Sequence, residues 1–134
     1  KFEERAQVMV NFFDSIEVAP GVHGNGSLTL GENIADHGGL QVSFQAFKKA
    51  TEAAPLEIVD GFTPEQRFFL AYANVWAGNI RPEEILRLTK LDPHSLGKWR
   101  VDGALPHIEN WYEAFKITEQ DPMFVPKDKR VSIW

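Results

Sequence analysis

Two acidic residues four positions apart are the feature of this sequence most suited to chemistry. Glu32 and Asp36 lie in the stretch NGSLTLGENIADHGGL, residues 25–40. On a helix this spacing places both carboxylates on one face, about one turn apart, where like charges repel by a few tenths of a kcal/mol. The pair is easier to explain if a cation or a histidine faces it.

The same residues also allow a structural interpretation. Thr29 and Glu32 have the spacing of a capping box, in which the glutamate bonds back to the amide of Thr29. Asp36 would then be a solvated acid near a helix start, favoured by the helix dipole. Gly38 and Gly39 each cost about 1 kcal/mol relative to Ala inside a helix, which suggests that another element approaches their backbone closely.

Residues 25–40 resemble the pattern N-G-x-x-T-L-G-E-N-I-A-D-x-G-G-L of neprilysin-family (endothelin-converting-enzyme-like) zinc metallopeptidases. The resemblance implies that Glu32 is a zinc ligand and zinc the cofactor. It also implies that Asp36 accepts a hydrogen bond from a zinc-binding histidine, which would fix the tautomer and orientation of that ligand. Two His and one Glu, with water in the fourth position, form an arrangement suited to catalytic zinc.

A second segment, DPHSLGKWRVDG at residues 92–103, resembles the H-S-P-G-x-F-R-V-x-G segment of the same family. The resemblance implies that His94 stabilises the oxyanion that develops beside zinc, a contribution of about 3–4 kcal/mol for a preorganised donor. It implies that Arg100, whose rigid fork suits carbonyl recognition, binds a substrate backbone carbonyl. Leu96 stands where the family has Pro, and Trp99 where it has Phe. Without the resemblance, a histidine after Asp-Pro would be interpreted as a surface-loop residue.

The resemblance extends over nearly the whole chain. Residues 62–78, FTPEQRFFLAYANVWAG, resemble a helix of the family, and residues 104–117, ALPHIENWYEAFKI, resemble its closing helix. Apolar positions at helical spacing are most simply core, so these helices receive no catalytic role. His23, His37 and His107 receive none either, and are interpreted as surface or packed histidines.

The H-E-x-x-H helix, which supplies two zinc ligands and the general base in this family, does not occur around any of the four His. We therefore expect residues 1–134 to be the C-terminal portion of the peptidase catalytic domain, lacking that upstream helix. Its partners would be peptide substrates and the N-terminal remainder of the same protein. The parent enzyme is expected to hydrolyse short peptides on the amino side of a hydrophobic residue, and the isolated chain is expected to be inactive.

Two other functions stay open at this point. One is a non-catalytic peptide-binding or interaction module, in which the acids are helix caps and the 10 Phe, 4 Trp and 2 Tyr line a groove. The other is a degenerate family member kept for structure, against which the joint presence of Glu32, Asp36, His94 and Arg100 argues. An in-frame H-E-x-x-H encoded upstream of Lys1 would favour the enzyme.

The composition is that of an ordinary soluble domain, with 43% hydrophobic and 25% charged residues. A net charge of -5 without a Lys/Arg run disfavours nucleic acid as a partner. No apolar run approaches about 18 residues, so no transmembrane segment is expected. The lack of Cys excludes disulfides and thiol catalysis, and is compatible with the cytoplasm or with a bacterial periplasmic or extracytoplasmic location.

Helical periodicity and helix-start signals dominate the chain, and strand alternation is weak. The expected fold class is mainly α, resembling the C-terminal helical part of a zincin-type (thermolysin-like) catalytic domain. Thr63, Pro64 and Gln66 form a strong helix start. The expected elements are helices over 1–17, from 29–32 to 54, over 63–78, over 82–91 and over 106–115, with loops over 19–31 and over 94–105, the latter containing an extended piece at 99–101.

The peptidase interpretation also makes geometric demands. Glu32 and Asp36 should lie on one helix face, and a loop carrying His94 and Arg100 should fold back toward that face, so that all four residues face one cleft. Under the structural interpretation nothing brings these two segments together. Their separation or convergence therefore tests the assignment.

A second geometric expectation comes from the resemblance alone. In extracellular animal relatives, the positions of Val8 and Val131 resemble Cys sites whose disulfide joins the first helix to the C-terminus. Here the resemblance implies a hydrophobic contact in its place, with the two Cα atoms about 6 Å apart.

Overall fold

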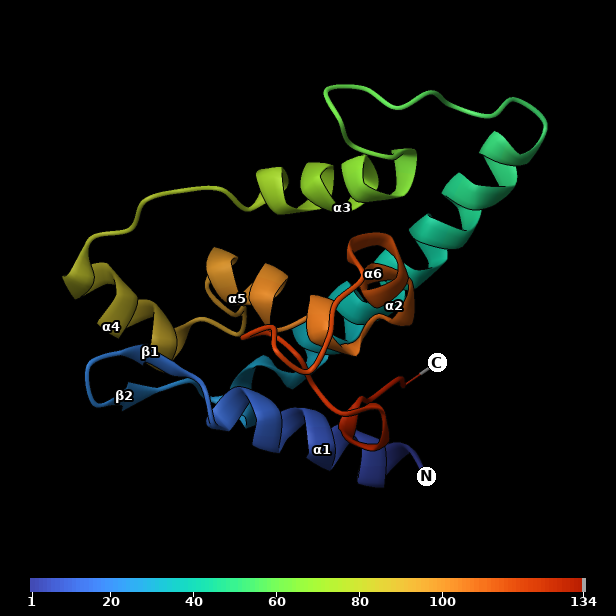
Figure 1. Ribbon diagram of the computed structural model, residues 1–134. Helices are drawn as coiled ribbons and strands as arrows, with labels where there is room; N and C mark the ends of the chain where they lie inside the picture. Colours follow the sequence, from blue (N-terminus) through green and yellow to red (C-terminus); the bar gives the residue numbers. More distant parts are fainter. Residues whose placement is uncertain (134) are drawn as a thin grey trace.

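The computed structural model describes residues 1–133 as a mainly helical fold, which confirms the expected fold class. Figure 1 shows the long helix α2 running away from α1, with α6 beside it, and with α4 next to the strands β1 and β2. The elements in chain order are α1 Phe2–Asp14, β1 Glu17–Ala19, β2 Val22–His23, α2 Gly26–Glu52, α3 Pro64–Val75, α4 Pro82–Leu91, α5 Gly97–Asp102, the 3-10 turn η1 Leu105–His107, α6 Glu109–Phe115 and the 3-10 turn η2 Lys127–Lys129.

Helix α2 begins where it does because its first residue can approach α1 closely. A Cβ on Gly26 would lie 2.1 Å from the carbonyl oxygen of Val10, so only glycine fits at this crossing. The amide of Gly26 donates to Asp14 Oδ1 at 2.6 Å. Asn25 is the N-cap, and its Oδ1 accepts from the amide of Leu28 at 3.0 Å. The helix thus starts at Gly26, before the predicted start at 29–32.

Two hydrophobic clusters hold the described helices together. The larger contains Leu40, Phe44, Phe69, Leu105, Ile108, Trp111 and Tyr112, and joins α2 to α3, η1 and α6. In it, the rings of Phe44 and Phe69 stack with centroids 5.1 Å apart. The smaller contains Met9, Phe13 and Val131, and joins α1 to the C-terminal tail. Leu30 and Ile34 of α2 pack against the smaller cluster, so α2 contacts both clusters.

The first helix ends at Asp14, before the predicted end at 17, and a short antiparallel hairpin over residues 17–23 leads into the predicted loop. Periodicity could not reveal it, because its strands have three and two residues. Gly21 turns the chain with φ of 71°, and its amide donates to the carboxylate of Glu17 at 2.7 Å. The hairpin packs near α4, as Figure 1 shows. It leads the chain from α1 into the first turn of α2.

The predicted extended piece over 99–101 is wrong, because residues 97–102 form helix α5. The carbonyl of Leu96 accepts from the amides of Trp99 and Arg100 at 2.8 and 3.1 Å. A Cβ on Gly97 would lie 2.8 Å from the carbonyl oxygen of Trp76, so the helix begins directly against the end of α3. A helix this short depends on such tertiary packing more than on propensity.

The helix starts at Thr63 and Pro82 are confirmed. Thr63 and Gln66 form a reciprocal capping box, with the two bonds at 3.2 and 3.0 Å. Helix α3 ends at Val75, three residues before the predicted end. The helix predicted over 106–115 is divided into η1 and α6 at Ile108, whose backbone is extended.

The C-terminal tail returns to α1, as the resemblance implied. Val131 is 4% exposed and packs with Met9 and Phe13, whereas Val8 is 43% exposed. A contact between Val8 and Val131, with their Cα atoms about 6 Å apart, stays a prediction. The tail is also fixed by a hydrogen bond from the amide of Val131 to His107 Nδ1 at 3.1 Å. Within residues 1–133, no helix is both long and apolar enough to span a membrane.

Candidate functional site

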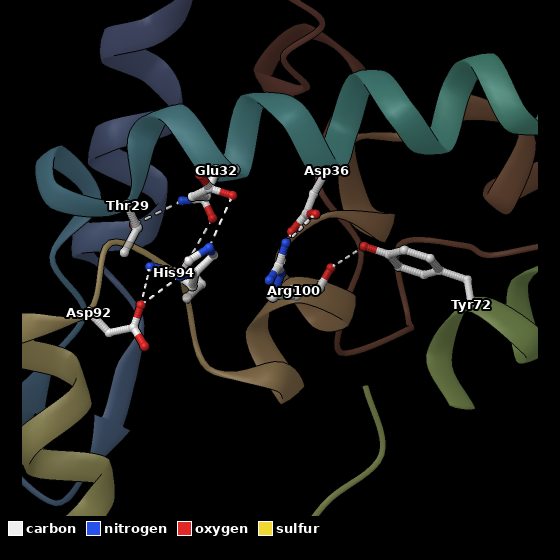
Figure 2. A network of polar contacts seen from close by, with 9 residues as sticks. Thr29, Glu32, Asp36, Tyr72, Asp92, His94 and Arg100 are labelled. Atoms are coloured by element: carbon white, nitrogen blue, oxygen red, sulfur yellow. Dashed lines mark hydrogen bonds and ion pairs between the residues drawn. The ribbon is translucent and has the colours of Figure 1, made fainter. Parts of the chain in front are cut away.

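Glu32 and Asp36 project from the same face of α2, toward the chain segment that carries His94 and Arg100 (Figure 2). Their side chains are 43% and 12% exposed. The capping interpretation of Glu32 fails, because the helix starts at Gly26 and Thr29 lies inside it. The hydroxyl of Thr29 donates instead to the carbonyl of Asn25 at 3.0 Å. Glu32 therefore lies in the second turn of α2, and its partly exposed carboxylate faces His94.

His94 lies opposite Glu32, with Nε2 3.3 Å from Glu32 Oε2. Its other ring nitrogen lies 2.7 Å from Asp92 Oδ1, which also accepts from the backbone amide of His94 at 2.9 Å. These two bonds, the amide bond first, lower the pKa of Asp92. Asp92 thus occupies Nδ1, and Nε2 faces Glu32. When both ring nitrogens carry a proton, Nδ1 donates to Asp92 and Nε2 is the donor that faces the site.

Arg100 and Asp36 form a bidentate ion pair, with Nε and Nη2 each 2.6 Å from one carboxylate oxygen. Both side chains are nearly buried, at 13% and 12% exposure, and the hydrogen bond to Asp36 raises the pKa of Arg100. The guanidinium also stacks over Trp76, with Cζ 3.9 Å from the ring centroid. Arg100 lies on helix α5, not on a loop as predicted.

Tyr72 connects this pair to α3. Its hydroxyl donates to the backbone carbonyl of Arg100 at 2.9 Å (Figure 2). Burial, followed by the charge of Asp36, raises the pKa of Tyr72 to about 12. The phenol therefore stays protonated and remains a donor at neutral pH, which holds α5 against α3.

The predicted convergence of the two segments is thus found, with Arg100 and Asp36 64 positions apart in the sequence. A small pocket beside His94 is lined also by Thr29 and Trp99, and its lining includes neither Glu32 nor Asp36 nor Arg100. The four side chains therefore meet along one face of α2, and this pocket is not the single cleft that was expected for all four.

Sequence reasoning missed five residues that shape this site: Asn33, Tyr72, Trp76, Asp92 and Ser95. The role of Asp92 could have been predicted, because an Asp side chain often accepts a hydrogen bond from the backbone amide two residues later, here that of His94. The others act across long sequence distances. Of the histidines without an assigned role, His37 and His107 are packed in the core at 2% and 4% exposure.

Glu32 is the residue that could bind zinc here: it offers a carboxylate that is 43% exposed, with His94 Nε2 3.3 Å away. Within residues 1–133, no group of three or more His, Cys, Asp or Glu is placed to bind a metal together. Catalytic zinc takes three protein ligands. The described residues could therefore supply part of the ligand set of a zinc site and not all of it.

The profile of Peptidase family M13 matches residues 1–131. Neprilysin of Homo sapiens is 37% identical over 139 residues, which cover 99% of this chain and 18% of neprilysin. Neprilysin-1 of Caenorhabditis elegans is 37% identical over 140 residues, which cover 100% of this chain and 18% of that protein. The chain thus spans less than a fifth of the length of these curated relatives.

Solved structures agree with the sequence matches. Mycobacterium tuberculosis zinc metalloprotease Zmp1, in complex with an inhibitor, aligns with a TM-score of 0.93 and 31% identity over 99% of this chain and 21% of its own. PepO from Lactobacillus rhamnosis aligns with a TM-score of 0.80 and 32% identity over 99% of this chain and 20% of its own. Because sequence and fold are shared over almost its whole length, the chain belongs to peptidase family M13.

Proposed function

We propose that this chain is the C-terminal portion of the catalytic domain of a zinc-dependent endopeptidase. It supplies Glu32 as one zinc ligand, while two histidine ligands and the general base come from an upstream H-E-x-x-H helix. The substrates are short peptides, cleaved on the amino side of a hydrophobic residue. The observation that carries the proposal is the convergence of His94 on Glu32 and of Arg100 on Asp36, from segments about 60 residues apart.

Each of the four side chains has a distinct task in this proposal. When bound, zinc polarises the scissile carbonyl and acidifies water. Glu32 holds the metal, and His94 donates to the oxyanion from the neighbouring position. Asp36 accepts from a zinc-binding histidine, for which its oxygens keep lone pairs beyond those that Arg100 occupies.

Arg100 keeps hydrogen-bond capacity for a substrate. Its Nε and Nη2 engage Asp36, and a guanidinium carries five donors in total. Remaining N–H groups can therefore donate to a peptide carbonyl without breaking the ion pair. In this arrangement Asp36 holds Arg100 in a fixed orientation, which favours a single register of the bound peptide.

Several large apolar side chains are exposed on the described chain, among them Val42 at 66%, Ile58 at 66%, Val75 at 70% and Leu91 at 67%. They lie on different elements, and single exposed apolar side chains are common on protein surfaces. In the proposed enzyme the N-terminal remainder of the same protein covers some of them and completes the zinc site.

The decisive experiment is His94→Ala in the complete gene product, with His23→Ala on the exposed hairpin as the matched control. Loss of an oxyanion donor should lower kcat about 10²–10³-fold, with KM and zinc content little changed. The control should retain the parental kcat. Peptide binding without any hydrolysis by the parental protein would instead favour the non-catalytic module.

A further inference from the structure

A short chain of polar side chains runs beneath the exposed pair of Glu32 and His94. Asn33 follows Glu32 on α2, and Ser95 follows His94 on the turn before α5. The hydroxyl of Ser95 donates to Asn33 Oδ1 at 2.8 Å. Asn33 is 2% exposed, whereas the side chains of Glu32 and His94 are 43% and 46% exposed. The half-buried bond and the exposed contact therefore join the same two segments, one residue apart.

The direction of every bond in this chain is determined. Thr29 Oγ1 has one hydrogen, which it donates to the carbonyl of Asn25 at 3.0 Å. It must therefore accept from Asn33 Nδ2, which lies 2.9 Å away. The amide of Asn33 then has one orientation, with Oδ1 toward Ser95. Because Asn25 caps α2, the chain connects the His94 turn to the first turn of that helix.

The half-buried bond to Asn33 is better suited than the exposed contact to fix the distance between Glu32 and His94. Water competes for the exposed contact, while a buried Oδ1 left without its donor would be an unsatisfied polar atom. Asp92 also holds His94, but Asp92 belongs to the same turn. It orients the ring relative to that turn and does not place the turn relative to α2.

We propose that Asn33 and Ser95 are positioning residues that set the placement of His94 over Glu32 in the peptidase reaction. This inference rests on the proposed function, since it assigns to Asn33 and Ser95 the alignment of an oxyanion donor. A misplacement near 1 Å lowers the rate of an enzymatic step by up to about 10²-fold. Loss of the tether therefore affects kcat and leaves peptide binding largely intact.

The test is Ser95→Ala in the complete gene product, which removes one bond and leaves Asn33 bonded to Thr29. We expect kcat to fall about tenfold, less than for outright loss of the donor, with KM and zinc content unchanged. Ser95→Thr keeps a hydroxyl and should restore most of kcat. Ser43→Ala is the matched control, because the Ser43 hydroxyl bonds only locally on α2, to the carbonyl of Leu40 at 3.1 Å.

A double-mutant cycle shows whether Ser95 acts through His94. In a His94→Ala background, Ser95→Ala should lower kcat no further. An equal loss of kcat in both backgrounds, or no loss in either, would overturn the inference. A role limited to stability would lower the melting temperature and leave kcat per folded molecule unchanged, which also counts against it.

A readout without activity separates this inference from the proposed function. Diethyl pyrocarbonate modifies accessible imidazoles, and mass spectrometry can follow the modification of His94 against His23 in the same sample. Ser95→Ala should speed the modification of His94 and leave that of His23 unchanged. If His94→Ala alone leaves kcat intact, the proposed role of His94 fails. The labelling result still decides whether Ser95 positions that residue.

Discussion

The two side-chain pairs of the site, Arg100 with Asp36 and His94 with Glu32, differ in their exposure to water. Arg100 and Asp36 are 13% and 12% exposed and bidentate, whereas His94 and Glu32 are about half-exposed and touch through one nitrogen. In a nearly buried bidentate pair, the two hydrogen bonds and the attraction of the charges offset the free-energy cost of removing both groups from water. The exposed contact is weaker and can be exchanged for a metal or a substrate oxygen. One pair thus suits a fixed frame, and the other suits the reacting groups.

Arg100→Met should therefore destabilise the chain. The substitution leaves the Asp36 carboxylate nearly buried without its partner, at a cost of about 2–4 kcal/mol in unfolding free energy. Equilibrium urea unfolding measures the change. Arg87→Met is the control, because Arg87 pairs with Glu84 on an exposed helix surface and should leave the midpoint unchanged. Similar midpoint shifts in both variants would show that burial does not distinguish the two pairs.

The buried histidines His37 and His107 make stability depend on pH. Burial, followed by the charge of His107, lowers the pKa of His37 from 6.5 to about 3. Burial also lowers the pKa of His107, to about 4. The two rings lie 5.4 Å apart, and His107 Nδ1 accepts from the amide of Val131, which requires an unprotonated nitrogen. Protonation of either ring thus opposes the packing of the C-terminal tail.

The sign of the effect follows from these lowered values. Between about pH 6.5 and 3 the unfolded chain binds more protons than the folded chain. The contribution of these neutral histidines to the unfolding free energy is therefore complete above pH 6.5 and is lost as the pH falls. From pH 7 to 4 we expect a loss of about 3 kcal/mol for each ring. Urea unfolding at several pH values measures it.

The comparison variant is the double substitution His37→Asn and His107→Asn. Asn does not titrate in this range and can still accept from the amide of Val131. The variant should lose most of the dependence between pH 7 and 5, where few carboxylates titrate. His23→Asn, on the exposed hairpin, should behave like the parent. A double variant with the parental slope would assign the dependence to other groups.

At the scale of residues, the sequence predicted the site where a residue belonged to a specific sequence motif. Residues 25–40 and 92–103 predicted that Glu32, Asp36, His94 and Arg100 would converge, and they do. The direct pairing of Arg100 with Asp36 was not predicted, because a short sequence motif carries no information on contacts with a residue 64 positions away.

At the scale of elements, close backbone approaches determine where helices start. Gly26 permits the crossing of α1 and α2, and Gly97 permits α5 to begin against Trp76. The glycines that the sequence singled out behave differently. Gly38 is buried, while Gly39 is exposed and a Cβ there would meet no atom within 4 Å among the described residues. The close approach of another element thus explains Gly26 and Gly97, but the described residues give no such reason for Gly39.

Gly26→Ala should destabilise the chain by about 1–3 kcal/mol, because the added methyl group would overlap the carbonyl oxygen of Val10 and force α1 and α2 apart. Gly39→Ala is the matched substitution on the same helix. It should stabilise the chain by about 0.5–1 kcal/mol, since Ala restricts the unfolded chain and meets open space. Thermal or urea unfolding compares the two, and equal effects on stability would contradict the crossing geometry.

Elements with a self-contained start signal were predictable, and elements held by tertiary contacts were not. The capping box at Thr63 and the proline at Pro82 each act within four residues, and both starts are confirmed. Helix α5 has no side-chain cap, and its six residues are shorter than two turns. The hairpin strands are shorter still. Propensity cannot specify such short pieces, because nucleation is unfavourable without packing partners.

At the scale of the molecule, helix α2 connects the two hydrophobic clusters to the site. Its N-terminal half packs on α1 and carries Glu32 and Asp36, and its later turns bring Leu40 and Phe44 into the larger cluster. The site is thus placed by a rigid element anchored in the core, which favours a fixed geometry. The face that carries the acids still lacks enough donors to enclose a metal within residues 1–133.

The 134-residue chain should therefore retain much less than one zinc per molecule after dialysis and show no chelator-sensitive peptidase activity. One carboxylate with one neighbouring imidazole falls short of the three protein ligands of a catalytic zinc site, and mid-nanomolar zinc in the buffer would not fill it. Metal analysis by mass spectrometry measures the content. The complete gene product, if it contributes two histidines from an H-E-x-x-H helix, should retain one zinc and lose it on Glu32→Ala. Stoichiometric zinc in the chain alone would mean that His94 and its neighbours rearrange into a full ligand set, and the division of the site between two parts of one protein would be wrong.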